Sequence, residues 1–72
     1  MSKKQMVAMT FIKPEHRNIQ VVNVEENVEE IKEYAEQQGY HCKSAVNVLL
    51  LEKQYNQALS QNYKDFFEPS NK

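Results

Sequence analysis

The sequence predicts one small α+β domain with the element order β-β-α-β-α. It predicts a three-stranded, mainly antiparallel sheet of order 2-1-3 with one or two packed helices. Three observations support this fold class. The 72 residues suffice for one domain and no more. Two β-branched runs separated by a polar loop are typical of a hairpin. Two segments of helical periodicity then flank a third run that alternates like a strand.

The hairpin is expected at residues 5–13 and 19–24. The nearly continuous apolar run from Met6 to Ile12 indicates burial on both faces, so this strand belongs in the middle of the sheet. The loop between the strands is polar and contains Pro14, which favours a turn. A right-handed crossover then brings the third strand in parallel to the second, on the other side of the first strand.

The first helix is expected directly after Asn27, a favourable N-cap residue, and Glu30 is spaced to complete a capping box. Gly39, the only glycine, stands where a left-handed residue ends a helix. The buried stripe at helical spacing consists of Val28, Ile31 and Ala35, with Tyr34 at its margin.

The third strand is expected over residues 40–51, where Tyr40, Cys42, Val46, Val48 and Leu50 share one parity. A helix beginning near Ser44 is the alternative, because a short apolar run does not distinguish the two. From about Lys53 an amphipathic helix follows, and Pro69 prevents its continuation. We expect one domain over residues 1–72, with frayed tails at 1–4 and 69–72. The apolar positions of the second helix are Tyr55, Ala58, Leu59, Tyr63 and Phe66.

Composition predicts a soluble, cytoplasmic protein. The single cysteine forms no intramolecular disulfide, so nothing indicates an oxidising compartment. The basic start is followed neither by a long apolar segment nor by a cleavage site, which argues against a secretory signal. No apolar stretch approaches the ~18 residues of a membrane span.

Charge is unevenly distributed along the chain. Residues 25–36 hold six glutamates against Lys32 alone, whereas residues 1–24 hold four basic residues against Glu15 alone. The acidic block on a helix suggests a surface that docks on a basic partner. The expected partner-binding residues are Glu26, Glu29, Glu30, Glu33, Glu36 and Phe67, the last as an aromatic anchor.

The sequence offers few groups for catalysis, so we expect no enzymatic activity, no cofactor and no metal. His41 and Cys42 are adjacent, but neighbours in a strand point to opposite faces and do not share a ligand. Zinc sites need about four ligands, often in closely spaced pairs, and one glycine makes no phosphate-binding loop. Cys42 is expected to be a small core residue and His41 a surface residue.

Protein binding therefore fits the sequence best: a non-catalytic module that binds a larger protein and inhibits or modulates it. The alternative is a small, dimeric nucleic-acid-binding regulator that uses Lys3, Lys4, Lys13 and Arg17. In either case a homodimer is expected, with the charge-free second strand as its edge through Ile19 and Val21. The alternative is that the second helix folds back and covers this surface within one chain.

In size and element order the chain resembles the small single-domain proteins that phages encode to inhibit host or defence machinery. The resemblance covers the architecture of the whole chain and involves no particular residue. It implies inhibition of a larger protein, or of a complex that handles nucleic acid, and it assigns no site.

Overall fold

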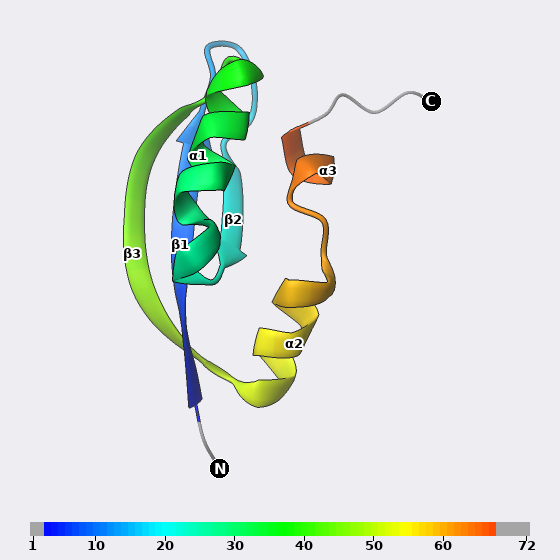
Figure 1. Ribbon diagram of the computed structural model, residues 1–72. Coiled ribbons are helices and arrows are strands. Elements are labelled where there is room, and N and C mark those ends of the chain that lie inside the picture. Colours follow the sequence, from blue (N-terminus) through cyan, green and yellow to red (C-terminus); the bar gives the residue numbers. More distant parts are fainter. Residues whose placement is uncertain (1–2, 68–72) are drawn as a thin grey trace.

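The chain folds in the predicted order, with a 3-10 turn before the first helix and a break in the second. The computed structural model describes residues 3–67 (Figure 1). Residues 1–2 and the tail expected at 69–72 lie outside the described residues. The elements are β1 (Lys3–Ile12), β2 (Ile19–Asn23), the 3-10 turn η1 (Glu25–Asn27), α1 (Val28–Gln37), β3 (His41–Leu51), α2 (Glu52–Ser60) and α3 (Lys64–Phe67).

The strands form a sheet of order β2-β1-β3 in which both neighbouring pairs are antiparallel, as predicted. β2 and β3 therefore run in the same direction on either side of β1. Lys3 and Lys4, expected in a frayed tail, instead begin β1 and pair with Leu51 and Leu50. They are ordered because β3, at 11 residues, is long enough to reach them.

α1 packs on one face of the sheet through Ile31 and Ala35, which are both fully buried. Its predicted end at Gly39 is confirmed, with φ at +88°. The Tyr40 N–H donates to the Ala35 carbonyl at 2.9 Å, and the Gly39 N–H donates to the Glu36 carbonyl at 3.0 Å. These two bonds form the Schellman motif, for which a residue with positive φ is needed.

The start of α1 differs from the prediction. Asn27 holds the N-cap position, but its side chain makes no capping hydrogen bond. Its Nδ2 instead donates to Oδ1 of Asn23 at 2.8 Å, and that oxygen also accepts the Val24 N–H at 2.8 Å. The predicted capping interaction is therefore wrong. The turn η1 gives Asn27 helical backbone angles of φ −94° and ψ −2°, whereas a capping residue is usually extended, and the bond to Asn23 holds the side chain elsewhere. Asn23 thus fixes the end of β2 to the start of α1.

The core lies between α1 and the sheet. Directly opposed residues in antiparallel strands project to the same face, so Met9 of β1 and Val21 of β2 face α1 together. Burying each large apolar side chain here stabilises the fold by roughly 1.5–3 kcal/mol. The core cluster comprises Val7, Met9, Phe11, Val21, Ile31, Ala35 and Phe67.

β3 continues to Leu51, so the alternative of a helix beginning near Ser44 is wrong. The pairing with β1 shifts at Lys43, where one extra residue forms a β-bulge. A bulge reverses the alternation of side chains, so Cys42 faces α1 while the later even-numbered residues face the opposite side. The apolar parity predicted for this strand is therefore divided between both faces. The residues on the face away from α1 are Ser44, Val46, Val48 and Leu50.

The predicted second helix is interrupted at Gln61, whose backbone is extended at φ −86° and ψ 138°. Oδ1 of Asn62 then accepts the Lys64 N–H at 3.1 Å, at the start of α3. Asparagine favours such local hydrogen bonds over continuing a helix. The break lets the chain turn towards β2 after α2 (Figure 1).

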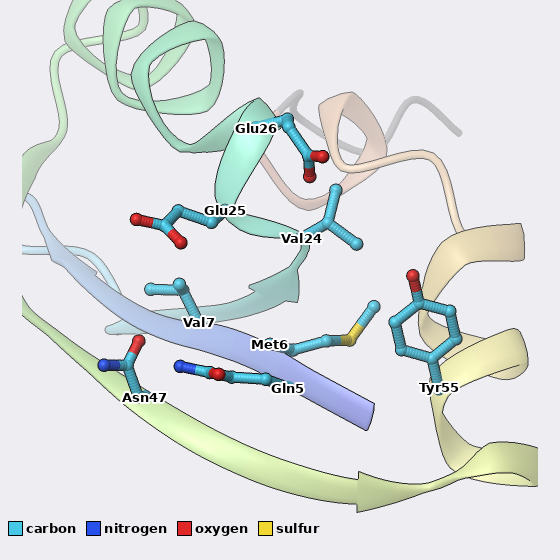
Figure 2. A pocket seen from close by; sticks show the side chains of 8 residues that line it. All are labelled: Gln5, Met6, Val7, Val24, Glu25, Glu26, Asn47 and Tyr55. Carbon is cyan, nitrogen blue, oxygen red and sulfur yellow. The ribbon is translucent and has the colours of Figure 1, made fainter. Parts of the chain in front are cut away.

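α2 and α3 cover different parts of the sheet. Met6 is fully buried on the face away from α1, and it points towards Tyr55 of α2 in Figure 2. α3 lies beside β2 (Figure 1). From there the Phe67 ring packs edge-on against Phe11, Tyr34 and Tyr40, with centroid distances of 5.1, 5.9 and 5.4 Å.

Candidate functional site

The acidic face of α1, defined as Glu29, Glu33 and Glu36, lies opposite the buried side of the helix. All three side chains are exposed, and together with Lys32 they line one shallow surface depression. Positions separated by four and three residues fall on one side of a helix. Because the other side of α1 is held in the core, the backbone positions of these glutamates are fixed relative to the sheet.

Glu30 belongs to a different environment. Its Oε2 accepts a hydrogen bond of 2.9 Å from the Tyr63 hydroxyl, in the segment that leads to α3. Burial, this hydrogen bond and the negative charge of Glu30 raise the pKa of Tyr63 above its ordinary value. The Tyr63 ring also contacts Tyr34 edge-on at 5.9 Å. Glu30 therefore holds the C-terminal segment against α1 and is separate from the acidic face.

Glu26 lies on η1, where it borders the pocket shown in Figure 2. This pocket has a volume of about 340 Å³ and is lined by residues of β1, β3, α2 and the segment around η1. The side chains of Glu25 and Glu26 diverge from η1 in this view. The pocket is lined by Gln5, Met6, Val7, Val24, Glu25, Glu26, Asn47 and Tyr55. This set mixes amides, carboxylates and apolar groups from several elements.

Phe67, predicted as a partner-binding anchor, is a core residue and only 4% exposed. Its neighbour Phe66 is 39% exposed and borders a depression together with Val22 and Leu50. Helical spacing places Phe66 in the apolar stripe of the second helix and leaves Phe67 outside it. The structure reverses this assignment, because the break at Gln61 ends that helix before Phe66. Of the two adjacent phenylalanines, Phe66 is therefore the exposed one.

The predicted dimer edge on β2 is not an open surface. Val21 is 1% exposed, and Ile19 packs partly buried against the core. α3 lies beside β2 (Figure 1), so the C-terminal segment covers this side of the sheet. Within one chain, the fold thus conceals the apolar side chains that made β2 a candidate edge.

The basic residues of the alternative hypothesis are not brought together. Lys3 and Lys4 begin β1, whereas Lys13 and Arg17 lie in the connection beyond its other end. Ten residues at about 3.3 Å each separate the two pairs by roughly 30 Å. The Lys13 ammonium also donates to the Gln38 carbonyl at 3.0 Å and lies 5.3 Å from the ring centroid of Tyr40.

Cys42 and His41 lie as expected for a strand. Cys42 packs partly buried against the core, and His41 is exposed. They pair with Phe11 and Ile12, which are neighbours in β1 and therefore face opposite sides. Over residues 3–67, no group of three or more His, Cys, Asp or Glu side chains is placed to hold a metal ion.

β3 holds the exposed apolar residues that the sequence reasoning did not select. Val46 is 56% exposed, Leu49 65% and Leu51 48%. The available signal was the absence of charge from Ser44 to Leu51, a longer uncharged run than that of β2. Sequence reasoning placed this strand beside β1 but did not identify it as the uncovered edge.

Comparisons with protein-family models, with curated proteins and with solved structures found no match for this chain. Within the described residues, no helix is both long enough and apolar enough to cross a membrane. The candidate site is the acidic face of α1, and the apolar edge strand β3 is a second exposed surface.

Proposed function

We propose that this protein is a non-catalytic interaction module that binds a larger protein through a basic surface of that partner and inhibits or modulates it. The observation that carries the proposal is the acidic face of α1, where Glu29, Glu33 and Glu36 are exposed on a helix anchored by buried Ile31 and Ala35. The row extends over eight residues, from Glu29 to Glu36, which is about 10 Å along the helix axis.

Anchoring matters because binding loses free energy whenever groups must be ordered on contact. The glutamates of α1 stand on a helix that is already fixed to the sheet, so their backbone positions need no ordering when the partner binds and only their side chains do. A complementary basic surface gains faster association and a defined orientation from such a charge pattern. Lys32, in the same depression, offsets part of the charge, because it lies three residues from Glu29 and four from Glu36 on the helix.

The structure removes some of the predicted partner-binding residues from the proposed surface. Glu30 is hydrogen-bonded to Tyr63, and Phe67 is in the core. We therefore assign partner contact to Glu29, Glu33 and Glu36. Glu26 lies apart from this face, on η1 beside the pocket shown in Figure 2. The resemblance to phage inhibitors supports inhibition as the consequence of binding, although it assigns none of these residues.

The test compares two variants with the same change in net charge. Glu29→Gln/Glu33→Gln removes two charges from the acidic face, and Glu15→Gln/Asp65→Asn removes two exposed charges elsewhere. Each variant and the wild type serve as bait in a lysate of the source cells, and retained proteins are identified by mass spectrometry. A partner should be retained by the wild type and the Glu15/Asp65 variant and lost with the Glu29/Glu33 variant.

The purified partner is then titrated at several salt concentrations. Wild-type affinity should fall as salt rises, and the loss caused by the Glu29/Glu33 variant should shrink in parallel, because salt screens exposed charges. Equal affinity of all three proteins for every captured partner would remove the acidic face from the proposal.

The alternative, nucleic-acid binding through Lys3, Lys4, Lys13 and Arg17, has less support from the geometry. The two pairs lie at opposite ends of β1, and Lys13 is held by Gln38. A fluorescence titration with single-stranded and duplex DNA and RNA at low salt tests it. Binding that falls steeply with salt and is lost in Lys13→Gln/Arg17→Gln would favour this function over the acidic-face proposal.

A further inference from the structure

β3 is an edge strand that is both long and uncovered on its outer side. Its 11 residues pair with β1 along one side only. No described element lies outside it in Figure 1. Edge strands in monomers are usually short, charged or covered, because their free N–H and C=O groups recruit other strands. β2 is short and has α3 beside it, whereas β3 is long and open.

The side chains of β3 resemble those of a central strand. The eight residues from Ser44 to Leu51 carry no charge. Apolar side chains are exposed on both faces, with Val46 on the side away from α1 and Leu49 and Leu51 on the α1 side. Near-continuous apolar runs are typical of strands that have neighbours on both sides. The sequence of β3 thus fits a strand that gains a second neighbour.

We propose that this neighbour is the β3 strand of a second copy of the chain, paired antiparallel about a two-fold axis. Such an axis, perpendicular to the sheet, brings the start of each β3 beside the end of the other. The uncharged run then pairs with itself, so no like charges oppose each other along it. The product is one continuous six-stranded sheet with no open β3 edge.

Charge complementarity favours a second copy over an unrelated strand. Lys43 immediately precedes the uncharged run, and Glu52 immediately follows it. In the two-fold arrangement Lys43 of one chain lies near Glu52 of the other, and the same contact is repeated at the opposite end. Within one chain these residues lie about 30 Å apart along an extended strand, so the attraction is available only between chains.

Sedimentation velocity from low to high micromolar concentration tests the proposal. The wild type should shift from the 8.5 kDa chain mass to twice that mass. Val46→Lys and Leu49→Lys should each raise the dissociation constant at least about tenfold, because they place like charges across the paired strands. Leu59→Lys, at an exposed leucine of α2, is the matched control and should leave the constant unchanged.

A charge-swap cycle tests the orientation. Lys43→Glu alone and Glu52→Lys alone should each weaken the dimer by roughly three- to tenfold, and the double variant should restore it. Hydrogen exchange of the wild type gives a readout free of mutation, since β3 amides should exchange more slowly as concentration rises. A wild type that stays monomeric at the highest concentration overturns the proposal. The proposal is also overturned if the dissociation constant of the dimer is unchanged in the β3 variants, or if the protein assembles into fibres.

Discussion

The two edge strands of this sheet place the same residue type, asparagine, in very different environments. Asn23 of β2 and Asn47 of β3 both pair with Val7 of β1, from opposite sides. Asn23 is 4% exposed and accepts two hydrogen bonds, whereas Asn47 is exposed on the border of the pocket in Figure 2. Because both asparagines pair with the same residue of β1, their level along the sheet does not explain why one is buried and the other is exposed. The β2 side is closed by the turn into α1 and by α3, while β3 has no such cover.

The largest expected effect compares a valine on each edge strand. Val21→Lys should leave the chain mostly unfolded, because an unpaired charge in the core costs several kcal/mol and a domain of this size has only about 5–15 kcal/mol of stability. Val46→Lys should change stability by less than about 0.5 kcal/mol. Circular dichroism at the lowest workable protein concentration compares both without self-association. A folded Val21→Lys variant would contradict the core described for β2.

The second comparison concerns the two adjacent phenylalanines of α3. Phe67→Ala should lower the free energy of unfolding by about 3–5 kcal/mol, since it leaves a cavity beside Phe11. Phe66→Ala should cost less than about 1 kcal/mol. Urea denaturation measures both variants, and Phe67→Leu extends the test if the alanine variant does not fold. If both variants lose the same free energy of unfolding, Phe67 does not hold α3 against the core beside β2.

The third comparison uses the paired asparagines. Asn23→Ala should cost about 1–3 kcal/mol, because it leaves the Val24 N–H and the Asn27 amide without their acceptor. Asn47→Ala should be nearly neutral. Thermal unfolding of both variants is sufficient for the measurement. A neutral Asn23→Ala variant would show that water replaces the lost acceptor and that the turn into α1 does not depend on this side chain.

The smallest expected effect concerns the hydrogen bond between Tyr63 and Glu30. Because the pKa of Tyr63 is raised in the folded state, its contribution to stability is complete below pH 10 and is lost as pH rises through the higher folded value. Tyr63→Phe should cost about 0.5 kcal/mol at neutral pH. The difference from the wild type should shrink above pH 10, as measured by urea denaturation at each pH.

Glu30→Gln is the control for that measurement. It keeps an acceptor oxygen for the phenol but removes the negative charge that disfavours the phenolate. The pKa of Tyr63, followed by its ultraviolet absorbance, should then move back towards 10. An unchanged value would mean that the charge of Glu30 does not contribute, and that burial and the hydrogen bond raise the pKa of Tyr63.

Much of the fold was predictable from local patterns. The strand order follows from the apolar run in β1, and the end of α1 follows from Gly39. The bulge at Lys43 was not predictable, because it depends on how β1 and β3 are aligned over their whole length. The break at Gln61 has a similar cause: helical spacing continues to Phe66, but the chain leaves the helix so that Phe67 reaches the core.

The candidate site was predictable to a similar degree. Helical periodicity is sufficient to place Glu29, Glu33 and Glu36 on one exposed face. It does not separate Glu30 from them, since that distinction depends on Tyr63, which lies far away in the sequence. The choice of open edge depends on the path of the C-terminal segment, so the sequence pointed to β2 although β3 is the strand left uncovered.

The contact between Phe11 and Phe67 also has a consequence for folding kinetics. It joins the first strand to the last described helix, so the core cannot close until nearly all of the described chain is available. Contacts between such distant segments slow folding, because a long loop must be closed before the contact forms. On the ribosome, β1, β2 and α1 emerge well before α3. Val21 and Phe11 therefore stay partly uncovered during synthesis, and we expect the nascent chain to become resistant to protease only after residue 67 has left the exit tunnel.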